Sequence, residues 1–185
     1  MRVITGSARG RNLTAPDGLD TRPTSDMTKG AVFSILQMMI ENSEFLDLFA
    51  GSGQMGIEAL SRGARSATFI DSDRKAIESI KTNLKNCGFM ERSKVAMMDS
   101  ISYIQNCSNK FDVIFLDPPY QKELIDKVLP YCGKCLKEEG IILCETEKNE
   151  QLPQDVEGLE LVKEYRYGKA KITSYRMKGD AAECE

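Results

Sequence analysis

From residue 45 onward, short apolar runs alternate with amphipathic segments, and this alternation constrains the fold more than any other feature of the sequence. The apolar runs are too short to cross a membrane and suit buried strands. Strands that alternate with helices form a parallel sheet covered on both faces. The expected strands are 45–49, 67–70, 94–98, 111–116 and 140–145, and the expected helices are 55–61, 73–86, a short one ending near 103, and 121–136.

Two strand-like stretches near the end of the chain break this alternation. Residues 159–167 and 170–177 are separated only by Gly168 and Lys169, so no helix can lie between them. Two strands joined by so short a turn form an antiparallel hairpin. The sequence therefore predicts an open α/β fold, in which a mostly parallel sheet ends in an antiparallel hairpin.

The first part of the chain has a pattern of its own. Residues 2–5 and 11–14 flank Gly6 and Gly10, which predicts a short β-hairpin. A helix that Ser25 or Asp26 can cap follows, with apolar residues on one face. The predicted organisation is a basic extension over residues 1–24 and one α/β domain over residues 25–185.

The sequence contains no histidine, and this excludes whole classes of chemistry. Ser-His-Asp triads, Cys-His dyads and His-ligated metal sites are impossible without an imidazole. Catalysis must therefore use carboxylates, backbone groups, aromatic rings or a reactive cofactor. We expect no metal centre.

The cysteines do not form a disulfide framework or a complete zinc site. Cys132 and Cys135 make one CxxC pair at the end of a predicted helix, whereas a redox pair usually opens a helix. No second pair completes a four-thiolate site, so we expect reduced, structural thiols. The N-terminus lacks the apolar segment of a signal peptide, and the sequence predicts a cytoplasmic protein.

Positive charge is concentrated near the N-terminus of a chain whose net charge is −3. The first 16 residues contain no acidic side chain. On charge alone, this segment is either a solvated basic arm or a contact for nucleic-acid phosphates. The arginines of the extension are Arg2, Arg9, Arg11 and Arg22.

A glycine-rich loop follows the first predicted strand of the domain. Gly51, Gly53 and Gly56 form a GxGxxG pattern directly before a helix. Missing side chains let a ligand approach the backbone, although nicotinamide, flavin and adenosyl ligands all use such loops. Asp71 ends the next strand, where a carboxylate can accept hydrogen bonds from ribose hydroxyls. Together these features indicate a nucleoside-containing ligand.

The tetrapeptide Asp117-Pro-Pro-Tyr120 is the most specific motif in the chain. A buried strand delivers it to the carboxyl edge of the sheet, where ligands bind in open α/β folds. Prolines stiffen the backbone and remove donors, so the Asp117 carboxylate and the Pro118 carbonyl can converge as acceptors. With the flat ring of Tyr120, they suit a planar group that bears an exocyclic amine. Asp99 follows the third strand and is either a helix cap or an acceptor for an adenine amine.

These motifs resemble those of S-adenosylmethionine-dependent amino methyltransferases. The closest similarity is to the bacterial family that methylates N2 of a guanine in 16S ribosomal RNA, and it covers nearly the whole chain. The sequence departs from the pattern of this family at two places. Asp71 stands where a glutamate is common, and Gln54-Met55 replaces a small-apolar pair. The segments that carry the resemblance are Leu46–Gly53, Gly56–Ala64, Asp117–Tyr120, Arg2–Gly6, Arg9–Arg11 and Arg22–Thr24.

The resemblance implies a Rossmann-like class I methyltransferase fold with a short basic N-terminal extension, S-adenosylmethionine as cofactor, and 16S rRNA as substrate, either free or within an assembling small subunit. Catalysis would depend on Asp117 and Pro118 as acceptors and on stacking by Tyr120. Asp47 would hold the methionine ammonium. The cofactor residues implied are Asp47, Gly51, Gly53, Gly56, Asp71 and Asp99, and the RNA-binding residues are Arg2, Arg9, Arg11 and Arg22.

Other functions remain open at the level of sequence. DNA adenine-N6 or cytosine-N4 methyltransferases share the tetrapeptide, but they usually carry a separate recognition domain. Protein-glutamine methyltransferases generally have asparagine at the position of Asp117. A nicotinamide oxidoreductase would leave the tetrapeptide without a role. A non-catalytic RNA-binding module would not require an intact tetrapeptide.

Overall fold

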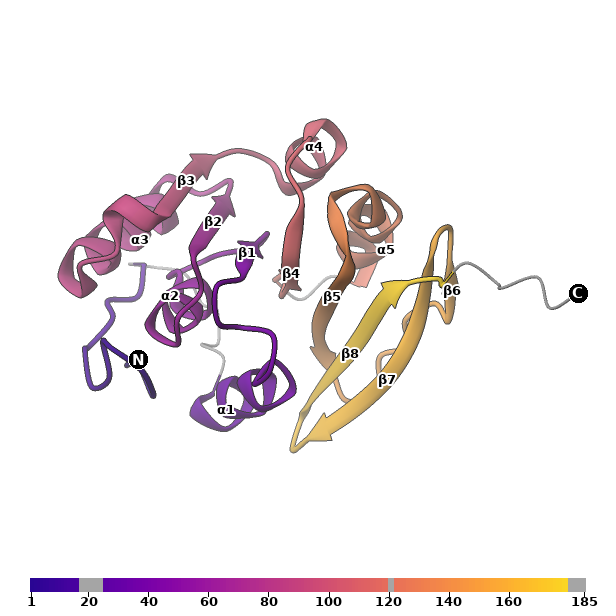
Figure 1. The fold of residues 1–185 in the computed structure, drawn as a ribbon, viewed down its shortest axis with the longest axis horizontal. Coiled ribbons are helices and arrows are strands. Elements are labelled where there is room, and N and C mark those ends of the chain that lie inside the picture. The colour runs from indigo at the N-terminus through magenta and orange to yellow at the C-terminus, as the bar shows by residue number, and fades with distance from the viewer. Residues whose placement is uncertain (17–24, 120–121, 180–185) are drawn as a thin grey trace, which may run out of the picture.

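The computed structural model describes residues 1–16, 25–119 and 122–179. In these residues, eight strands form one sheet in the order β3-β2-β1-β4-β5-β8-β7-β6, as Figure 1 shows. The strands β1 to β5 run parallel, and β6, β7 and β8 extend the sheet by antiparallel pairing. The strands are β1 (Glu44–Asp47), β2 (Ser66–Asp71), β3 (Ser93–Met97), β4 (Phe111–Leu116), β5 (Leu136–Glu147), β6 (Asp155–Val156), β7 (Leu159–Tyr167) and β8 (Ala170–Met177). The predicted fold class is confirmed.

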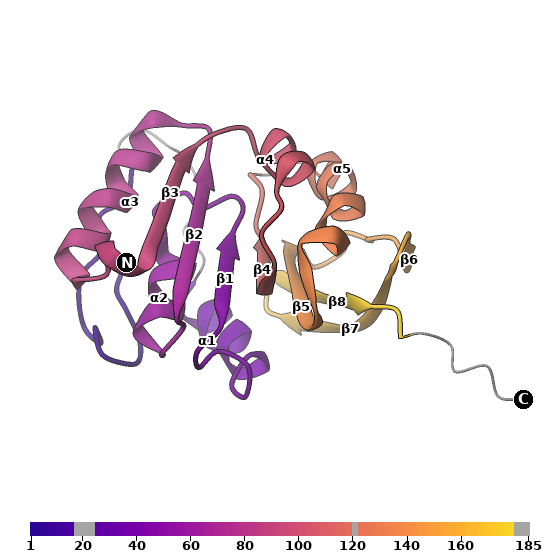
Figure 2. The same cartoon turned by 45° about the horizontal axis from the view of Figure 1, so that its top comes forward.

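Helices cover both faces of the sheet (Figure 2), and two apolar cores lie between the helices and the sheet. The first three helices pack on one face, and the last two pack on the other. None of the described helices is long and apolar enough to cross a membrane. The helices are α1 (Asp26–Ile35), α2 (Gln54–Ser61), α3 (Arg74–Cys87), α4 (Ser100–Asn106) and α5 (Lys122–Cys132), with short 3-10 turns at Met90–Arg92 and Gly133–Cys135.

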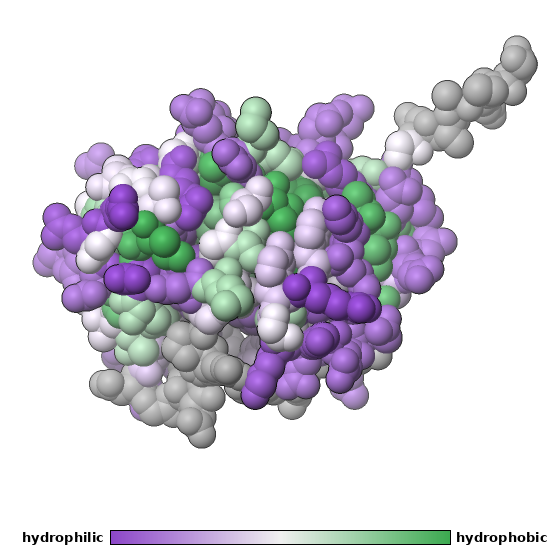
Figure 3. Space-filling view, turned by 90° about the horizontal axis from the view of Figure 1, so that it is seen from below, coloured by the Kyte–Doolittle hydropathy of each residue, from purple (hydrophilic) through white to green (hydrophobic). Residues whose placement is uncertain are grey.

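Burial separates apolar from polar side chains along each element. In β1, Phe45 faces the α1–α3 core and Leu46 faces the α4–α5 core, because successive strand residues point to opposite faces. On the face shown in Figure 3, hydrophilic side chains predominate and apolar ones occur in small separate groups. The apolar side chains that hold the layers together are thus mostly hidden from this side.

Three elements differ from the sequence prediction. The strand expected at 140–145 extends over Leu136–Glu147, because β4 and β8 pair with it along most of this length. The short β6 has no counterpart in the prediction. The helix expected to reach residue 136 ends at Cys132, and a 3-10 turn carries the chain to Cys135. The CxxC pair therefore closes a helix, as predicted, and both thiols are buried.

The N-terminal segment forms less of a hairpin than its sequence suggests. Its only described pairing of strand type is one antiparallel bridge, Arg2 to Asn12. Backbone hydrogen bonds flank this bridge, from the amide of Val3 to the carbonyl of Arg11 at 2.9 Å and from the amide of Leu13 to the carbonyl of Met1 at 3.0 Å. The amides of Ile4 and Thr5 donate instead to the buried carboxylate of Glu58 in α2, at 2.8 and 3.0 Å. The predicted hairpin is therefore present but short: residues 1–3 pair with residues 10–13, and beyond them the Glu58 side chain accepts the hydrogen bonds that a partner strand would receive.

Candidate functional site

Three carboxylates from separate strands meet at the carboxyl edge of the sheet. Asp47 ends β1 and Asp71 ends the neighbouring β2, while Asp117 directly follows β4 on the other side of β1. Since β1 pairs in parallel with both β2 and β4, these ends are adjacent. The strand order reverses between β1 and β4, and such switch points are where open α/β sheets bind ligands.

The loop after β1 has the conformation that its glycines permit. Gly51 and Gly53 have φ values of 53° and 77°, in the region that side chains disfavour. A Cβ atom at Gly51 would meet no other atom within 4 Å, so the loop faces open space at this point. Gly53 is the N-cap of α2 and supplies no capping side chain. A ligand can therefore approach the backbone closely at Gly51, whereas a Cβ atom at Gly53 would lie 3.2 Å from Cγ1 of Ile80 in the core.

Gly56, the third glycine, also has a packing role. A Cβ atom there would lie 2.3 Å from Cε1 of Phe69 in β2, far too close for any real contact. Its backbone amide donates to Oδ2 of Asp47 at 3.1 Å. Gly56 thus lets α2 lie against β2 and fixes the side chain of Asp47; its predicted contact with a cofactor stays a prediction.

Asp47 is a buried carboxylate with an unusual pKa. Only 2% of the residue is exposed, and its pKa is raised to about 7, mainly by this burial. The carboxylates of Asp117 and Asp71 contribute to this rise in pKa, and the hydrogen bond from Gly56 opposes it. A carboxylate held in this state would be stabilised by a cationic group placed next to it.

Asp71 is connected to the glycine loop. Its Oδ2 accepts the amide of Gly51 at 2.8 Å, and its Oδ1 accepts the amide of Asp73 at 2.9 Å. Burial raises its pKa, while these two hydrogen bonds oppose the rise. Each carboxylate oxygen has a second lone pair, so both retain capacity to accept from hydroxyl groups.

The end of β3 adds an acid and two exposed methionines to the same edge. Asp99 caps α4 by accepting from the amide and the hydroxyl of Ser102, at 2.8 and 3.0 Å. The cap predicted as one alternative is therefore present, and a contact with adenine stays a prediction. Met97 pairs with Asp71 in the sheet and is 61% exposed, and Met98 is 45% exposed. The sequence motifs do not identify Met97 and Met98 as site residues, although two methionines directly before a helix cap could have indicated exposed apolar side chains at this edge.

The proline tetrapeptide begins beside Asp47. Asp117 and Pro118 are half-buried and Pro119 is exposed. The carboxylate of Asp117 is close enough to raise the pKa of Asp47. Tyr120 lies outside the described residues. The structure thus brings Asp117 and Pro118 to the same edge as the glycine loop, on the far side of β1 from Asp71.

The described members of the predicted RNA-binding set lie elsewhere, on the face formed by α1 to α3. Arg2, Arg9 and Arg11 are exposed, and Arg22 lies outside the described residues. The amide of Ala8, next to Arg9, donates to Oγ of Ser61 at the last turn of α2. Arg11 is near the end of α3, where its charge opposes the burial that raises the pKa of the Cys87 thiol. Arg9 and Arg11 are therefore separated from the carboxylates by the lengths of α2 and α3.

The segment that carries these arginines is firmly docked. Val3 and Leu13 are buried in the core beneath α1 to α3. The fully buried ammonium of Lys29 donates to the carbonyl of Arg2 at 2.7 Å. Apolar residues thus anchor the segment, while its arginines point to solvent. The sequence motifs do not identify Lys29 or Glu58 as buried anchors. The one signal for this role is that each charged residue lies on an otherwise apolar face of its helix.

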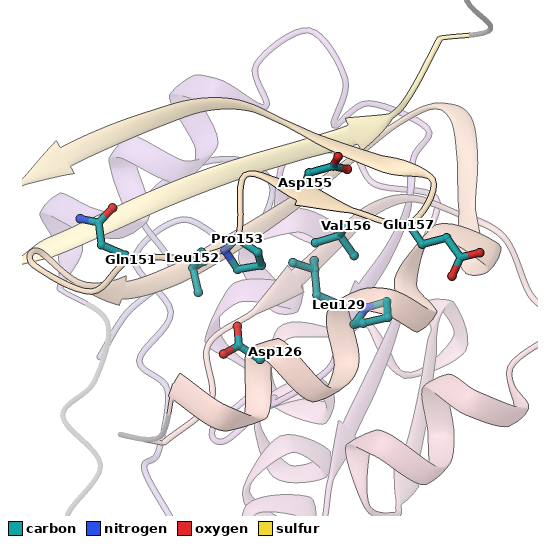
Figure 4. A pocket seen from close by; sticks show the side chains of 9 residues that line it. Asp126, Leu129, Gln151, Leu152, Pro153, Asp155, Val156 and Glu157 are labelled. Atoms are coloured by element: carbon teal, nitrogen blue, oxygen red, sulfur yellow. The ribbon is translucent and has the colours of Figure 1, made fainter.

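A separate pocket of about 640 Å³ lies between α5 and residues 151–157 (Figure 4). None of the predicted site residues lines it. In the described part of the chain, no three His, Cys, Asp or Glu side chains are grouped as metal ligands. The residues that line the pocket are Asp126, Leu129, Pro130, Gln151, Leu152, Pro153, Asp155, Val156 and Glu157.

Comparison with known proteins shows similarity over nearly the whole chain. The family described as Conserved hypothetical protein 95 matches residues 1–176. A "Putative rRNA methyltransferase YlbH" of Bacillus subtilis is 37% identical, with 97% of this chain and 100% of the relative covered. "Ribosomal RNA small subunit methyltransferase D" of Haemophilus influenzae is also 37% identical, with 96% and 92% covered. The solved structure of "Putative methyltransferase yhhF from Escherichia coli" superposes with a TM-score of 0.85 at 32% identity, with 96% and 98% covered.

Proposed function

This chain belongs to the Conserved hypothetical protein 95 family, and from that premise we propose that it methylates the exocyclic N2 amine of a guanine in 16S ribosomal RNA, with S-adenosylmethionine as methyl donor. Relatives aligned over most of its length are named as rRNA methyltransferases, so methyl transfer to rRNA is the activity that the family supports. The choice of guanine N2 rests on the chemistry of the tetrapeptide and on the sequence motifs. The choice of subunit agrees with the names of two of these relatives.

The carboxyl edge fits S-adenosylmethionine, whose sulfonium supplies a methyl group that is already electrophilic. Asp47 would hold the ammonium of the methionine part, because a neighbouring cation relieves the cost of a buried carboxylate. Gly51 and Gly53 would allow the ligand to lie against the backbone. Asp71 would accept from the ribose hydroxyls, and Asp99 from the adenine amine.

Two further residues, which the sequence motifs do not identify, belong to the proposed cofactor site. Met97 and Met98 are exposed beside Asp71 and before Asp99. Their side chains are flexible and apolar, and they offer an adaptable surface for a planar ring. We include them in the adenine contact of the proposed site.

The other side of β1 would receive the target base. The Asp117 carboxylate and the Pro118 carbonyl would accept the two N–H groups of the guanine amine, which favours a more tetrahedral nitrogen with its lone pair toward the methyl group. Asp117 would also stabilise the positive charge that develops on this nitrogen. Stacking by Tyr120 would fix the plane of the base, at about 1–3 kcal/mol.

One observation carries this proposal: Asp47 and Asp71 lie on one side of the switch point and Asp117 on the other, at adjacent strand ends. A donor bound over β1 and β2 would therefore be next to an acceptor bound after β4. Holding two reactants side by side can supply several kcal/mol of rate acceleration. The protein is proposed to work in the cytoplasm, where this substrate is made.

The test is methyl transfer followed by identification of the product. The protein is incubated with labelled S-adenosylmethionine and with 16S rRNA, either free or within small subunits, and the nucleosides are then separated. We expect label in N2-methylguanosine. Label in adenine or cytosine of added DNA would instead identify a DNA amino methyltransferase. RNA binding without any transfer would identify a non-catalytic module, and both results would contradict the proposal.

A further inference from the structure

Asn83 connects the N-terminal segment to the glycine loop through its side-chain amide. It lies on the buried side of α3 and is fully buried. Its Nδ2 donates to the carbonyls of Ser52 and Thr14, both at 2.9 Å, and its Oδ1 accepts the amide of Thr14 at 2.8 Å. A primary amide has two N–H donors, so both are used, one on each of the two segments.

Ser52 is well placed to transmit this connection. It lies between Gly51 and Gly53, the two residues whose backbone we assign to the cofactor. Its hydroxyl is 3.4 Å from the sulfur of Met1, as donor to it. The N-terminal segment therefore contacts the side chain of Ser52 directly and, through Asn83, its carbonyl. A movement of the glycine loop at Ser52 would therefore change these contacts.

A neighbouring residue holds the same segment without contacting the loop. The hydroxyl of Ser79, one turn earlier in α3, donates to the carbonyl of Thr14 at 2.7 Å. Ser79 thus shares the Thr14 attachment with Asn83, but it has no described bond to Ser52. Ser79 therefore only attaches the N-terminal segment to α3, whereas Asn83 both attaches the segment and connects it to the glycine loop. Substituting each residue in turn distinguishes these two effects.

We propose that Asn83 is a positioning residue that couples RNA binding by the N-terminal segment to cofactor binding by the glycine loop. This inference rests on the proposed function. RNA phosphates that hold the segment would, through Asn83, hold the carbonyl of Ser52 and reduce the motion of the loop, so the cofactor would bind more tightly. Coupling of this kind is reciprocal, so the cofactor would strengthen RNA binding by the same factor.

The experiment measures the dissociation constant of S-adenosylhomocysteine with and without an oligouridylate, which offers phosphates but no guanine. In the wild type we expect the RNA to lower this constant about fivefold or more. In Asn83→Ala the ratio should fall to within about twofold of one, whereas Ser79→Ala should keep most of it. If the alanine variant does not fold, Asn83→Asp replaces it in this comparison, because it retains the size of the side chain and the acceptor for Thr14.

The possible results separate this inference from the proposed function. A wild-type ratio of one, with both ligands bound, overturns the coupling and leaves the proposed function intact. A ratio in Asn83→Ala equal to that of the wild type also overturns it. If the wild type binds neither ligand, the proposed function is wrong, and amide exchange then decides the positioning role. Faster exchange at Gly51 and Gly53 in Asn83→Ala, but not in Ser79→Ala, supports it, and equal exchange overturns it.

Discussion

The amide of Gly51 donates a 2.8 Å hydrogen bond to Oδ2 of Asp71, which joins the glycine loop after β1 to the acid at the end of β2. The second oxygen of Asp71 is fixed by the amide of Asp73. The sheet and the start of α3 thus position the carboxylate before any ligand arrives. A nucleoside that uses Asp71 would meet a preorganised site, which lowers the cost of binding.

Asp71→Ala should weaken binding of S-adenosylmethionine by about 1–3 kcal/mol, because hydrogen bonds to a charged group are lost and Gly51 loses its acceptor. Asp73→Asn is the control, since an asparagine can still cap α3 and does not face the loop amide. Calorimetry on the two variants and the wild type measures the effect. Equal affinities in all three would refute the assignment of Asp71 to the ribose.

Asp117→Ala should abolish methyl transfer and leave cofactor affinity within a few-fold of the wild type, because Asp117 faces the target amine in the proposed site. The matched control is Asp112→Asn, at the other end of β4, where Asp112 binds Lys137 and the amide of Glu44. Single-turnover transfer and calorimetry are measured together. Near wild-type turnover in Asp117→Ala would contradict the mechanism.

The raised pKa of Asp47 predicts a specific dependence of stability on pH. Between the unfolded pKa of 3.8 and the folded pKa of about 7, the folded protein binds the extra proton. The free energy of unfolding contributed by Asp47 should therefore fall as pH rises through this window, by up to a few kcal/mol, and stay constant above it. Urea denaturation from pH 5 to 8 should show a smaller decrease for Asp47→Asn than for the wild type. The same pH dependence in both proteins would show that Asp47 ionises normally.

Glu58→Ala should destabilise the fold by about 3–5 kcal/mol, because it leaves a partly buried Arg62 without its carboxylate and two backbone amides without an acceptor. Glu78→Ala is the control. It removes an exposed pair with Arg74 of the same i,i+4 spacing and should cost less than about 0.5 kcal/mol. Urea denaturation compares the two, and similar costs would show that Glu58 is not an anchor.

Neutralising Arg9 and Arg11 together should reduce the salt dependence of RNA binding. Each phosphate contact on a single strand contributes about −0.7 to the log–log slope, so we expect a change of roughly one to two units. Affinity for the cofactor measured without RNA should not change, since these exposed side chains are far from the carboxyl edge. The control removes Lys127 and Lys134 on the opposite face. Parallel salt plots for the wild type and the arginine variant would place the RNA contact elsewhere.

The sequence predicts the sheet and the carboxyl-edge acids well, because both follow from local patterns. Short apolar runs identify β1 to β4, and the position of an acid directly after a strand places Asp71 and Asp117 at one edge. It does not predict the docking of residues 1–14, which depends on contacts between segments far apart in the chain. A buried Glu58 and a buried Asn83 resemble ordinary polar helix positions until their partners are known. The length of β5 likewise depends on its neighbours rather than on its own residues.

Val3 and Ile172 belong to the same apolar core, although nearly the whole chain separates them. During synthesis, the segment around Val3 leaves the ribosome long before β8 exists, so this core cannot be completed until β8 has been made. Contacts between such distant residues slow folding and leave apolar surface exposed in the meantime. The native core should therefore form only after β8 has been made, and until then the nascent chain should depend on chaperones more than a chain whose core closes between neighbouring segments.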